Sequence, residues 1–294
     1  MGAPILPLGV EELSAATAVA DLVGVLSAAL AGRAPVPACR VRPWTGPPAG
    51  DDAAVDPTPV DLDPAVLDPA GQDGDGLLLV EDDDARFLVP AAGLRAVHAA
   101  ALATLAAREL VAPGPVRAVV LGTGAVLRPQ LTMIVRRLPT VRHITVHPAG
   151  ARIDPGALAE VDLTSVTLSV AEDVGAAVEG ARLVFAHDGA WVVPADRLAP
   201  GALVVRAGAC PVRAAAAAVD QRFTDDPAAA GDAVRLADVL TGAHPGRATA
   251  DAVVLVDLVG AAGLDLVACV LHGAARERGF GAGGVRCAGT GCGT

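Results

Sequence analysis

From residue 113 onward, short apolar runs alternate with segments of helical periodicity, which is the rhythm of strands joined by helices. The apolar runs have the length and the β-branched content of buried strands, and they read VRAVVL, HITVH, VTLSV, ARLVFAH and GALVVRAG. The segments LRPQLTMIVRRL and AEDVGAAVEG lie between them and favour helices. This alternation predicts βαβ units and a mostly parallel sheet over residues 113–246, which we take as one domain.

The pattern before residue 113 is different. Residues 11–32 carry apolar side chains at helical spacing up to Gly32 and predict one helix. The Pro-, Asp- and Gly-rich segment that follows predicts loops and short edge strands. The stretch LLLVEDDDARFLVP predicts a hairpin with an acidic turn at 81–84, and residues 91–110 predict an alanine-rich helix of about five turns.

The last apolar stretch begins near residue 250 and predicts a strand or helix start followed by a long helix. It contains Asp257 and Asp265, which would be costly in lipid, so we expect no membrane partner. The chain opens without a basic segment, so we expect no signal peptide. We assign residues 1–112 and 247–280 to a second domain, and we expect the Gly-rich tail 281–294 to be disordered.

Composition narrows the classes of partner. Aromatic residues make up 2% of the chain and Tyr is absent, so the core must be built from Ala, Val and Leu. The net charge is −11 and the Arg residues are scattered, which argues against a nucleic-acid partner. The five cysteines show no CxxC pair and no His at ligand spacing. We therefore expect no metal site and no disulfide framework, and a cytoplasmic location.

A glycine-containing turn follows the first strand of the parallel sheet. It reads Gly122-Thr123-Gly124-Ala125-Val126 and leads directly into a predicted helix. In a dinucleotide-binding loop the first glycine makes the tight turn, the second admits the pyrophosphate, and the helix N-terminus faces the anion. Leu127 occupies the position where a small residue normally allows close helix packing. The turn predicts NAD or NADP binding, with a Rossmann-like turn that holds no ligand as the alternative.

The choice between the two cofactors depends on the end of the second strand. The segment HITVHPAGAR supplies no Asp or Glu for a ribose 2′-hydroxyl. Arg152 follows a few residues later and is suited to a 2′-phosphate, although a surface arginine in a loop is the alternative. We therefore expect a slight preference for NADP.

Across residues 90–280, the order of these segments resembles the ornithine cyclodeaminase/mu-crystallin family. The matching stretches are LRAVHAAALATLAA, LGTGAVLRPQL, ARLVFAH, GALVVRAGACP and LADVLTGAHPGRATADAVVLVDLVGAAGLDLVAC, the last being the most specific. The resemblance implies an α/β fold in which a Rossmann-like domain is inserted in an α/β platform that forms homodimers. It also implies NAD(P)-dependent redox chemistry at an amine or imine carbon of a small amino-acid-derived substrate.

Several positions depart from the family pattern. The family's carboxylate-binding arginine falls on His98, which is either a relocated acid/base group or a helix residue with satisfied hydrogen bonds. The family's active-site lysine has no candidate, because the chain contains no Lys. The arginine of the family's first substrate-binding strand corresponds to Arg40, with Arg42 as the second choice. The resemblance therefore places substrate-binding residues at positions whose chemistry has changed.

The strand end VVRAGACP carries the largest departure. The family's catalytic aspartate falls on Ala209, whose methyl group can neither hold an ammonium nor move a proton, so ornithine cyclodeamination is not expected. Gly208 and Cys210 keep the family's places beside the cofactor and the substrate.

Three further positions carry titratable groups. His187 and Asp188 stand where the family has small neutral residues, and they form either a new acid/base pair or a solvated turn. Asp257 approaches the expected site, where it either contacts the substrate as a catalytic candidate or caps the following helix.

Three interpretations remain. The first is an NAD(P)-dependent oxidoreductase of altered specificity in specialised metabolism, acting on an imine or amine with His98, His187, Asp188 and Asp257 as candidate catalytic groups. The second is a dimeric binding or scaffold protein that has lost its chemistry. The third is a non-redox enzyme with Cys210 as nucleophile, which would require a lowered thiol pKa and a nearby base.

Overall fold

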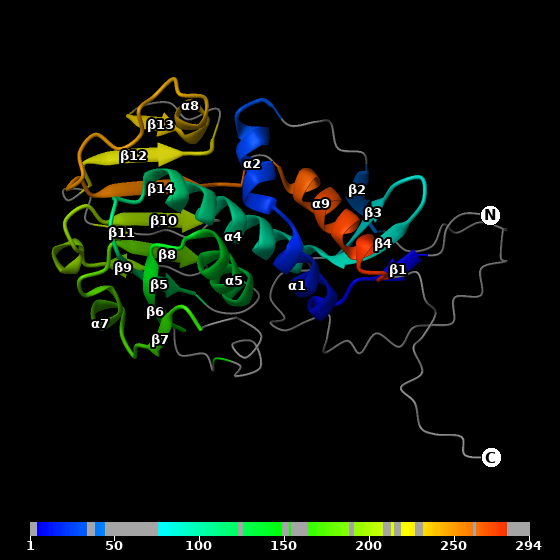
Figure 1. Cartoon of the computed structure of the whole chain (residues 1–294), viewed down its shortest axis with the longest axis horizontal. Coiled ribbons are helices and arrows are strands. Elements are labelled where there is room, and N and C mark those ends of the chain that lie inside the picture. Colours follow the sequence, from blue (N-terminus) through cyan, green and yellow to red (C-terminus); the bar gives the residue numbers. More distant parts are fainter. Residues whose placement is uncertain are drawn as a thin grey trace, which may run out of the picture.

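In its described residues, the computed structural model contains a larger and a smaller sheet, each packed against helices, and a separate pair of short strands (Figure 1). It describes residues 5–33, 39–44, 76–122, 126–148, 153, 164–187, 191–207, 213–214, 219–226, 232–260 and 263–280. The larger sheet lies toward one end of the molecule and the smaller sheet toward the other, with one long helix running between them (Figure 1).

The larger sheet has eight strands in the order β13-β12-β14-β10-β8-β5-β6-β7, and all its neighbouring strands are parallel. Its strands are β5 (Val116–Leu121), β6 (Val141–His147), β7 (Thr167–Val170), β8 (Leu183–His187), β10 (Leu203–Ala207), β12 (Gln221–Thr224), β13 (Ala233–Arg235) and β14 (Val254–Leu258). Two short strands, β9 (Val192–Val193) and β11 (Arg213–Ala214), pair separately. This architecture confirms the expected α/β fold with a parallel, Rossmann-like sheet.

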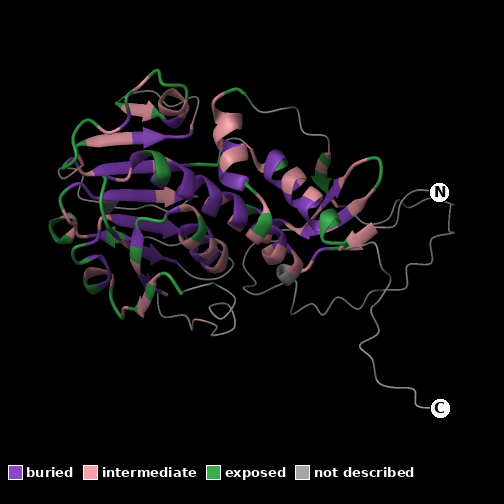
Figure 2. Cartoon of the chain, viewed as in Figure 1, coloured by how far each residue is buried: buried purple, intermediate pink, exposed green. Residues whose placement is uncertain are grey.

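Apolar strands and small helix residues hold the larger sheet against its helices. All five residues of β8 are buried, as expected for a central parallel strand covered on both faces (Figure 2). Helix α4 (Ala91–Leu110) packs against β10, β14 and α5 (Leu127–Arg137), with α7 (Val174–Val178) beside β5 and β6. The alanines of α4 that face this contact are fully buried, so the helix backbone lies close to the sheet.

The smaller sheet has four strands in the order β1-β4-β3-β2. It is formed by β1 (Ile5–Pro7), β2 (Arg40–Pro43), β3 (Leu77–Glu81) and β4 (Arg86–Pro90), and the helices α1 (Val10–Val19), α2 (Leu22–Leu30) and α9 (Leu264–Glu277) accompany it. The predicted hairpin is present, since β3 and β4 are antiparallel and pair from Leu77↔Pro90 to Glu81↔Arg86.

The prediction of a single helix over residues 11–32 is wrong, because this segment forms two helices, α1 and α2. Asp21 begins the second helix, and its carboxylate accepts a hydrogen bond from the backbone N–H of Gly24 at 3.3 Å. No single helix in the described ranges is long and apolar enough to cross a membrane; α1 and α2 pass that test only as a pair, which is bent by 68°.

The segment after residue 232 also differs from expectation. Residues 233–235 form strand β13 before the short helix α8 (Leu236–Leu240), although the run DAVRLADVLTG, taken from the sequence alone, favours a helix. Strand β14 lies inside the large sheet, between β12 and β10. Residues 254–258 therefore complete the sheet that the sequence assigns to residues 113–246, and the boundary expected at 246/247 does not follow the edge of that sheet.

Cys39 and Cys269 form a disulfide, contrary to the expectation of no disulfide framework. Their Cα atoms are 5.6 Å apart, although the two residues are separated by 230 positions in the sequence. The bond joins the start of β2 to α9. Spacing along the chain gives no sign of a pairing at this separation, because only the fold brings β2 beside α9. The bond also does not accord with the reducing compartment that cysteine usage suggested.

Candidate functional site

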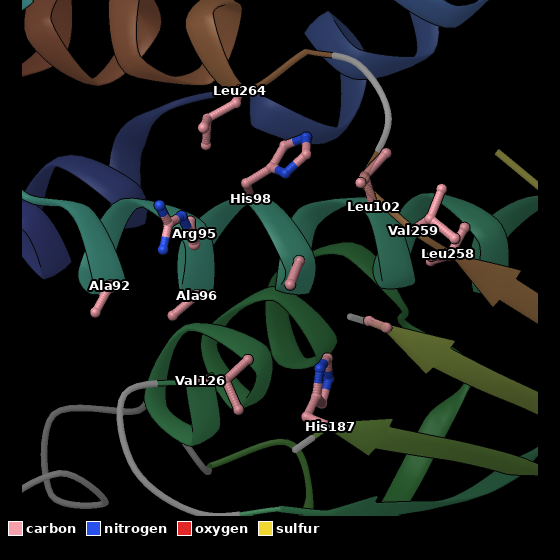
Figure 3. A pocket seen from close by; sticks show the side chains of 13 residues that line it. Ala92, Arg95, Ala96, His98, Leu102, Val126, His187, Leu258, Val259 and Leu264 are labelled. Carbon is pink, nitrogen blue, oxygen red and sulfur yellow. The ribbon is translucent and has the colours of Figure 1, made fainter. Parts of the chain in front are cut away.

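A cavity of about 490 Å³ lies at the carboxyl ends of the central strands of the large sheet, alongside α4 (Figure 3). Its described walls consist of Ala92, Arg95, Ala96, His98, Ala99 and Leu102 from α4, together with Val126, His187, Ala207, Leu258, Val259, Gly260 and Leu264. The volume falls within the range of small-molecule sites, and most of the lining side chains are apolar.

The position of the cavity follows from the order of the strands. The chain leaves β5 through α5 to β6 on one side, whereas β8 pairs with β5 on the other side. The carboxyl ends of β5 and β8 therefore border a topological switch point, where open parallel sheets bind their ligands. Val126 and His187 lie at this crevice and also line the cavity, so the crevice and the cavity are continuous.

Helix α5 begins at the cavity and is compatible with a bound anion. Its N-cap residue, Val126, makes no side-chain capping hydrogen bond, and its first turn contains no acidic residue. Backbone N–H groups at a helix N-terminus carry partial positive charge and suit a pyrophosphate. The N-terminus of α5 is thus suited to a dinucleotide. Thr123, Gly124 and Ala125 of the predicted loop lie outside the described residues.

Gly122 is required by the packing of the strand ends. Its φ is +148°, and a β-carbon there would lie 2.9 Å from the carbonyl oxygen of His187. Its backbone N–H donates to the carbonyl oxygen of His147 at 3.3 Å. The first glycine of the predicted loop is therefore needed for β5, β6 and β8 to meet, whether or not a cofactor is bound.

His187 stands at the end of β8 and is held by a chain of buried hydrogen bonds. Its Nε2 lies 2.9 Å from Oε1 of Gln130, and the Gln130 amide nitrogen donates to Oγ of Thr104 at 3.1 Å. The indole N–H of Trp191 donates to the carbonyl oxygen of His187 at 2.9 Å. Residues from α4, α5 and the loop after β8 thus fix both the ring and the backbone of His187.

Burial makes His187 a poor proton-transfer group. Complete removal from water lowers the pKa of His187 from 6.5 to about 4, so its ring is uncharged at neutral pH. A base of that strength is far from the optimum for proton transfer near pH 7. The predicted place of His187 in the site is supported by the cavity lining, but its electrostatics favour hydrogen bonding over acid/base work.

Arg95 and His98 line the cavity from one face of α4 (Figure 3). The two residues are three positions apart, so they lie one above the other on the helix. The imidazole of His98 lies near Gly260 and Gly263, where added β-carbons would be 3.6 and 3.7 Å from its ring atoms. In Figure 3, His98 projects toward Leu264, whereas His187 lies on the side of Val126. Arg95 was not predicted from the sequence, although its helical spacing from His98 is a usable signal.

Asp257 lies on the opposite face of the sheet from the cavity. Its carboxylate forms an ion pair with Arg206, the residue directly opposite on β10, with Oδ1 and Nε 2.8 Å apart. Ala207 and Leu258, the next residues on the two strands, line the cavity, and neighbouring residues of a strand point to opposite faces. This geometry does not favour the catalytic role expected for Asp257.

The two arginines expected to bind substrate lie in β2, at the edge of the small sheet. Arg42 is paired with Glu81 at 3.1 Å, and Arg40 is exposed. Neither is among the residues that line the cavity. The remaining predicted site residues, which are Asp188, Cys210, Arg152 and Gly208, lie outside the described residues.

Asp225 is a further residue of the site that was not predicted from the sequence. It is buried at the end of β12, and its two carboxylate oxygens accept the backbone N–H groups of Val259 and Gly260 at 2.7 and 2.9 Å. Val259 and Gly260 form part of the cavity wall. Asp225 therefore positions this wall. Within the described ranges, no three His, Cys, Asp or Glu side chains gather to hold a metal ion.

Comparison with known proteins identifies the fold. No protein-family model and no curated protein matches the chain. Among solved structures, CmnK is 22% identical with a TM-score of 0.62, over 98% of this chain and 99% of CmnK.

Two other solved structures are similar over nearly their full length. A lysine cyclodeaminase, described in recognition of L-lysine, L-ornithine and L-2,4-diaminobutyric acid, is 19% identical with a TM-score of 0.64, over 95% of this chain and 94% of its own. The iminosuccinate reductase of Paracoccus denitrificans, in complex with NAD+, is 13% identical with a TM-score of 0.62, over 95% of this chain and 98% of the reductase. The chain therefore has the fold shared by CmnK, lysine cyclodeaminase and iminosuccinate reductase.

Proposed function

We propose that the chain is a divergent member of the ornithine cyclodeaminase/mu-crystallin family and an NAD(P)-dependent oxidoreductase. Its substrate is a small amino-acid-derived molecule with an imine or amine carbon, and the working form is a homodimer. The observation behind the proposal is that one cavity lies between the N-terminus of α5, whose N-cap residue Val126 makes no side-chain capping bond, and a wall of α4 that presents Arg95 and His98.

Different described residues of the cavity would bind the cofactor, bind the substrate and transfer a proton in such a reaction. When bound, the nicotinamide cofactor would exchange a hydride with the substrate carbon. The N–H groups at the start of α5 would hold its pyrophosphate, and Arg95 would bind the substrate carboxylate. The apolar side chains of α4 and β14 would exclude water, and His98 would exchange a proton with the substrate. Ala209 replaces the family's catalytic aspartate, so we do not propose ornithine cyclodeamination.

The second candidate is a dimeric binding protein without catalysis. The low pKa of His187 favours it, as does the ion pairing of Asp257 away from the cavity, because both remove expected catalytic groups. The two candidates differ in one measurable property, since redox catalysis requires cofactor binding and turnover, whereas a binding protein needs neither.

Titration of the purified protein with NADH and with NADPH tests the proposal, with cofactor fluorescence and thermal shift as readouts. Binding at micromolar to low millimolar concentration is expected, with NADPH slightly tighter. The variants Val126→Asp and Val126→Asn form a matched pair, because the two new side chains have nearly the same size and only the first adds negative charge at the start of α5. Val126→Asp should weaken binding about tenfold more than Val126→Asn. No binding to the wild-type protein at millimolar cofactor would refute the redox function.

A further inference from the structure

We infer that Nδ1 of His187 is a fixed hydrogen-bond acceptor in the wall of the cavity, and that it binds an uncharged N–H group of the ligand. This inference deepens the proposed function and rests on it, since the ligand is the substrate or the cofactor of that same site. It assigns His187 to ligand selection, in place of the acid/base role that the sequence suggested.

The hydrogen-bond chain determines which nitrogen of His187 carries the proton. The amide nitrogen of Gln130 donates to Thr104, so the Gln130 oxygen is the atom that faces Nε2 of His187, at 2.9 Å. A carboxamide oxygen can only accept, so Nε2 must be the donor. A neutral imidazole has one N–H, and Nδ1 is therefore left with a lone pair.

Nδ1 is buried and has no hydrogen-bond partner within the described part of the chain. The residue is 1% exposed and lines the cavity, and its ring is held by Gln130 while its backbone is held by Trp191. A buried acceptor without a partner is unfavourable, and a ligand that donates to it is bound more tightly than one that cannot. The position thus selects for a donor.

The charges around the cavity determine what kind of donor fits. Arg95 brings a positive charge, and no Asp or Glu is present among the described lining residues. An ammonium group would enter an apolar cavity beside a cation and an uncharged imidazole, which is unfavourable. An uncharged N–H of an imine or an amide avoids this cost, and a carboxylate on the same ligand would be attracted to Arg95. The nicotinamide carboxamide and the substrate nitrogen are two sources of the same donor chemistry.

Two pairs of probes test the inference. Pyrrole-2-carboxylate and furan-2-carboxylate have nearly the same shape, but only the pyrrole presents an N–H. NADH and its 3-acetylpyridine analogue differ because a methyl group replaces the amide NH2. The wild-type protein should prefer the donor member of at least one pair by about tenfold or more in Kd. The pair that shows the preference identifies the source of the N–H.

His187→Phe keeps an aromatic side chain of similar size and removes the acceptor. It should reduce the preference to about one, whereas Arg42→Met, a change remote from the cavity, should leave the preference intact. The nitrogen chemical shifts of ¹⁵N-histidine-labelled wild-type protein give a test that needs no variant. They should show His187 Nδ1 without a proton, and this resonance should move when the donor probe binds.

Each remaining outcome bears on one claim. Equal affinity of the wild-type protein for both members of both pairs would overturn the inference, as would a proton on Nδ1. If NADH fails to bind and the preference for pyrrole-2-carboxylate persists, the acceptor role stands and the redox function falls. If NADH binds and neither pair shows a preference, the redox function stands and the acceptor role falls.

Discussion

A β-carbon on Gly122 would lie 2.9 Å from the carbonyl oxygen of His187 and 3.1 Å from its Cβ. The ends of β5 and β8 therefore meet through a residue that has no side chain. Gly122 directly follows β5, and His187 ends the neighbouring parallel strand β8 and lines the cavity of the candidate site. The glycine that suggests cofactor binding in the sequence is thus also a packing requirement, and its presence alone does not establish a bound dinucleotide.

Gly122→Ala should destabilise the protein and disturb the cavity. The new β-carbon would force a non-glycine residue into a positive φ, and it would also clash with the backbone carbonyl of His187. We therefore expect a loss of about 2–4 kcal/mol in the free energy of unfolding. Urea denaturation measures this loss. Gly180→Ala is the matched control, because Gly180 has a φ of +66° and no atom near the added β-carbon, and it should cost about 1 kcal/mol. Equal losses in the two variants would contradict the packing argument.

Asp225→Asn should weaken ligand binding in the cavity. The amide keeps one oxygen but turns an N–H₂ group toward the backbone N–H of Val259 or Gly260, so we expect a loss of about 1–3 kcal/mol in stability. The affinities for the cofactor and the probes should fall several-fold, because Val259 and Gly260 would no longer be held in place in the cavity wall.

Asp220→Asn is the control for that experiment. Asp220 lies at the other end of β12, where it accepts the N–H of Val253 at 2.7 Å. This variant should lose stability through the same kind of hydrogen bond and retain ligand affinity. A parallel fall of affinity in both variants would show that general stability, rather than the wall of the cavity, controls binding.

Arg95→Met should weaken binding of a ligand carboxylate by about 10- to 100-fold, because the charge-assisted hydrogen bonds are lost while the apolar stem is retained. Arg42→Met removes an arginine that is paired with Glu81 at the edge of the small sheet, and it should leave affinity unchanged. Isothermal titration with pyrrole-2-carboxylate measures both. A larger effect of Arg42→Met than of Arg95→Met would instead support Arg42 as the substrate-binding arginine, as the family resemblance suggested.

The parallel sheet could be predicted because buried parallel strands leave a direct trace in the sequence. Runs such as VRAVVL and ARLVFAH are apolar on both faces, and they became β5 and β8 with nearly the expected bounds. The break between α1 and α2 could not be read from the apolar periodicity, because it depends on the carboxylate of Asp21 capping a second helix. The position of β14 in the large sheet likewise depends on pairing between distant segments.

The candidate site was only partly predictable for the same reason. His98, His187 and Val126 line the cavity, and they lie inside α4, at the end of β8 and at the start of α5, which were placed nearly correctly. Asp257 was misplaced, because one position along a strand decides which face a side chain occupies. Gln130 and Asp225 act through hydrogen bonds to residues 57 and 34 positions away, which no local pattern reveals.

Removal of the disulfide by Cys39→Ser and Cys269→Ser should lower stability by about 2–5 kcal/mol, because the bond closes a very long loop of the unfolded chain. Thermal denaturation with and without a reductant measures the effect in the wild-type protein, and the double variant should be insensitive to the reductant. Thiol titration of the denatured oxidised protein should find two fewer free thiols than after reduction. An equal count would show that the bond does not form.

The stability of the protein should fall as the pH is lowered through the range set by His187. The pKa of His187 is 6.5 in the unfolded chain and about 4 in the folded protein, so between these values only the unfolded state binds a proton at this site. Unfolding is thereby favoured as the pH falls from 6.5 to 4. The contribution of His187 is fully present above pH 6.5, and up to about 3 kcal/mol of it is lost by pH 4.

His143 and His272 also have lowered pKa values, because both are partly removed from water, and they add a slope of the same sign. The effect of His187 is therefore isolated by comparing slopes in urea denaturation at several pH values. His187→Asn cannot titrate in this range, so its stability should fall less steeply than that of the wild-type protein, although it is less stable at neutral pH. Identical slopes would show that His187 is not held uncharged in the folded state, and the acceptor role proposed for its Nδ1 would lose its electrostatic basis.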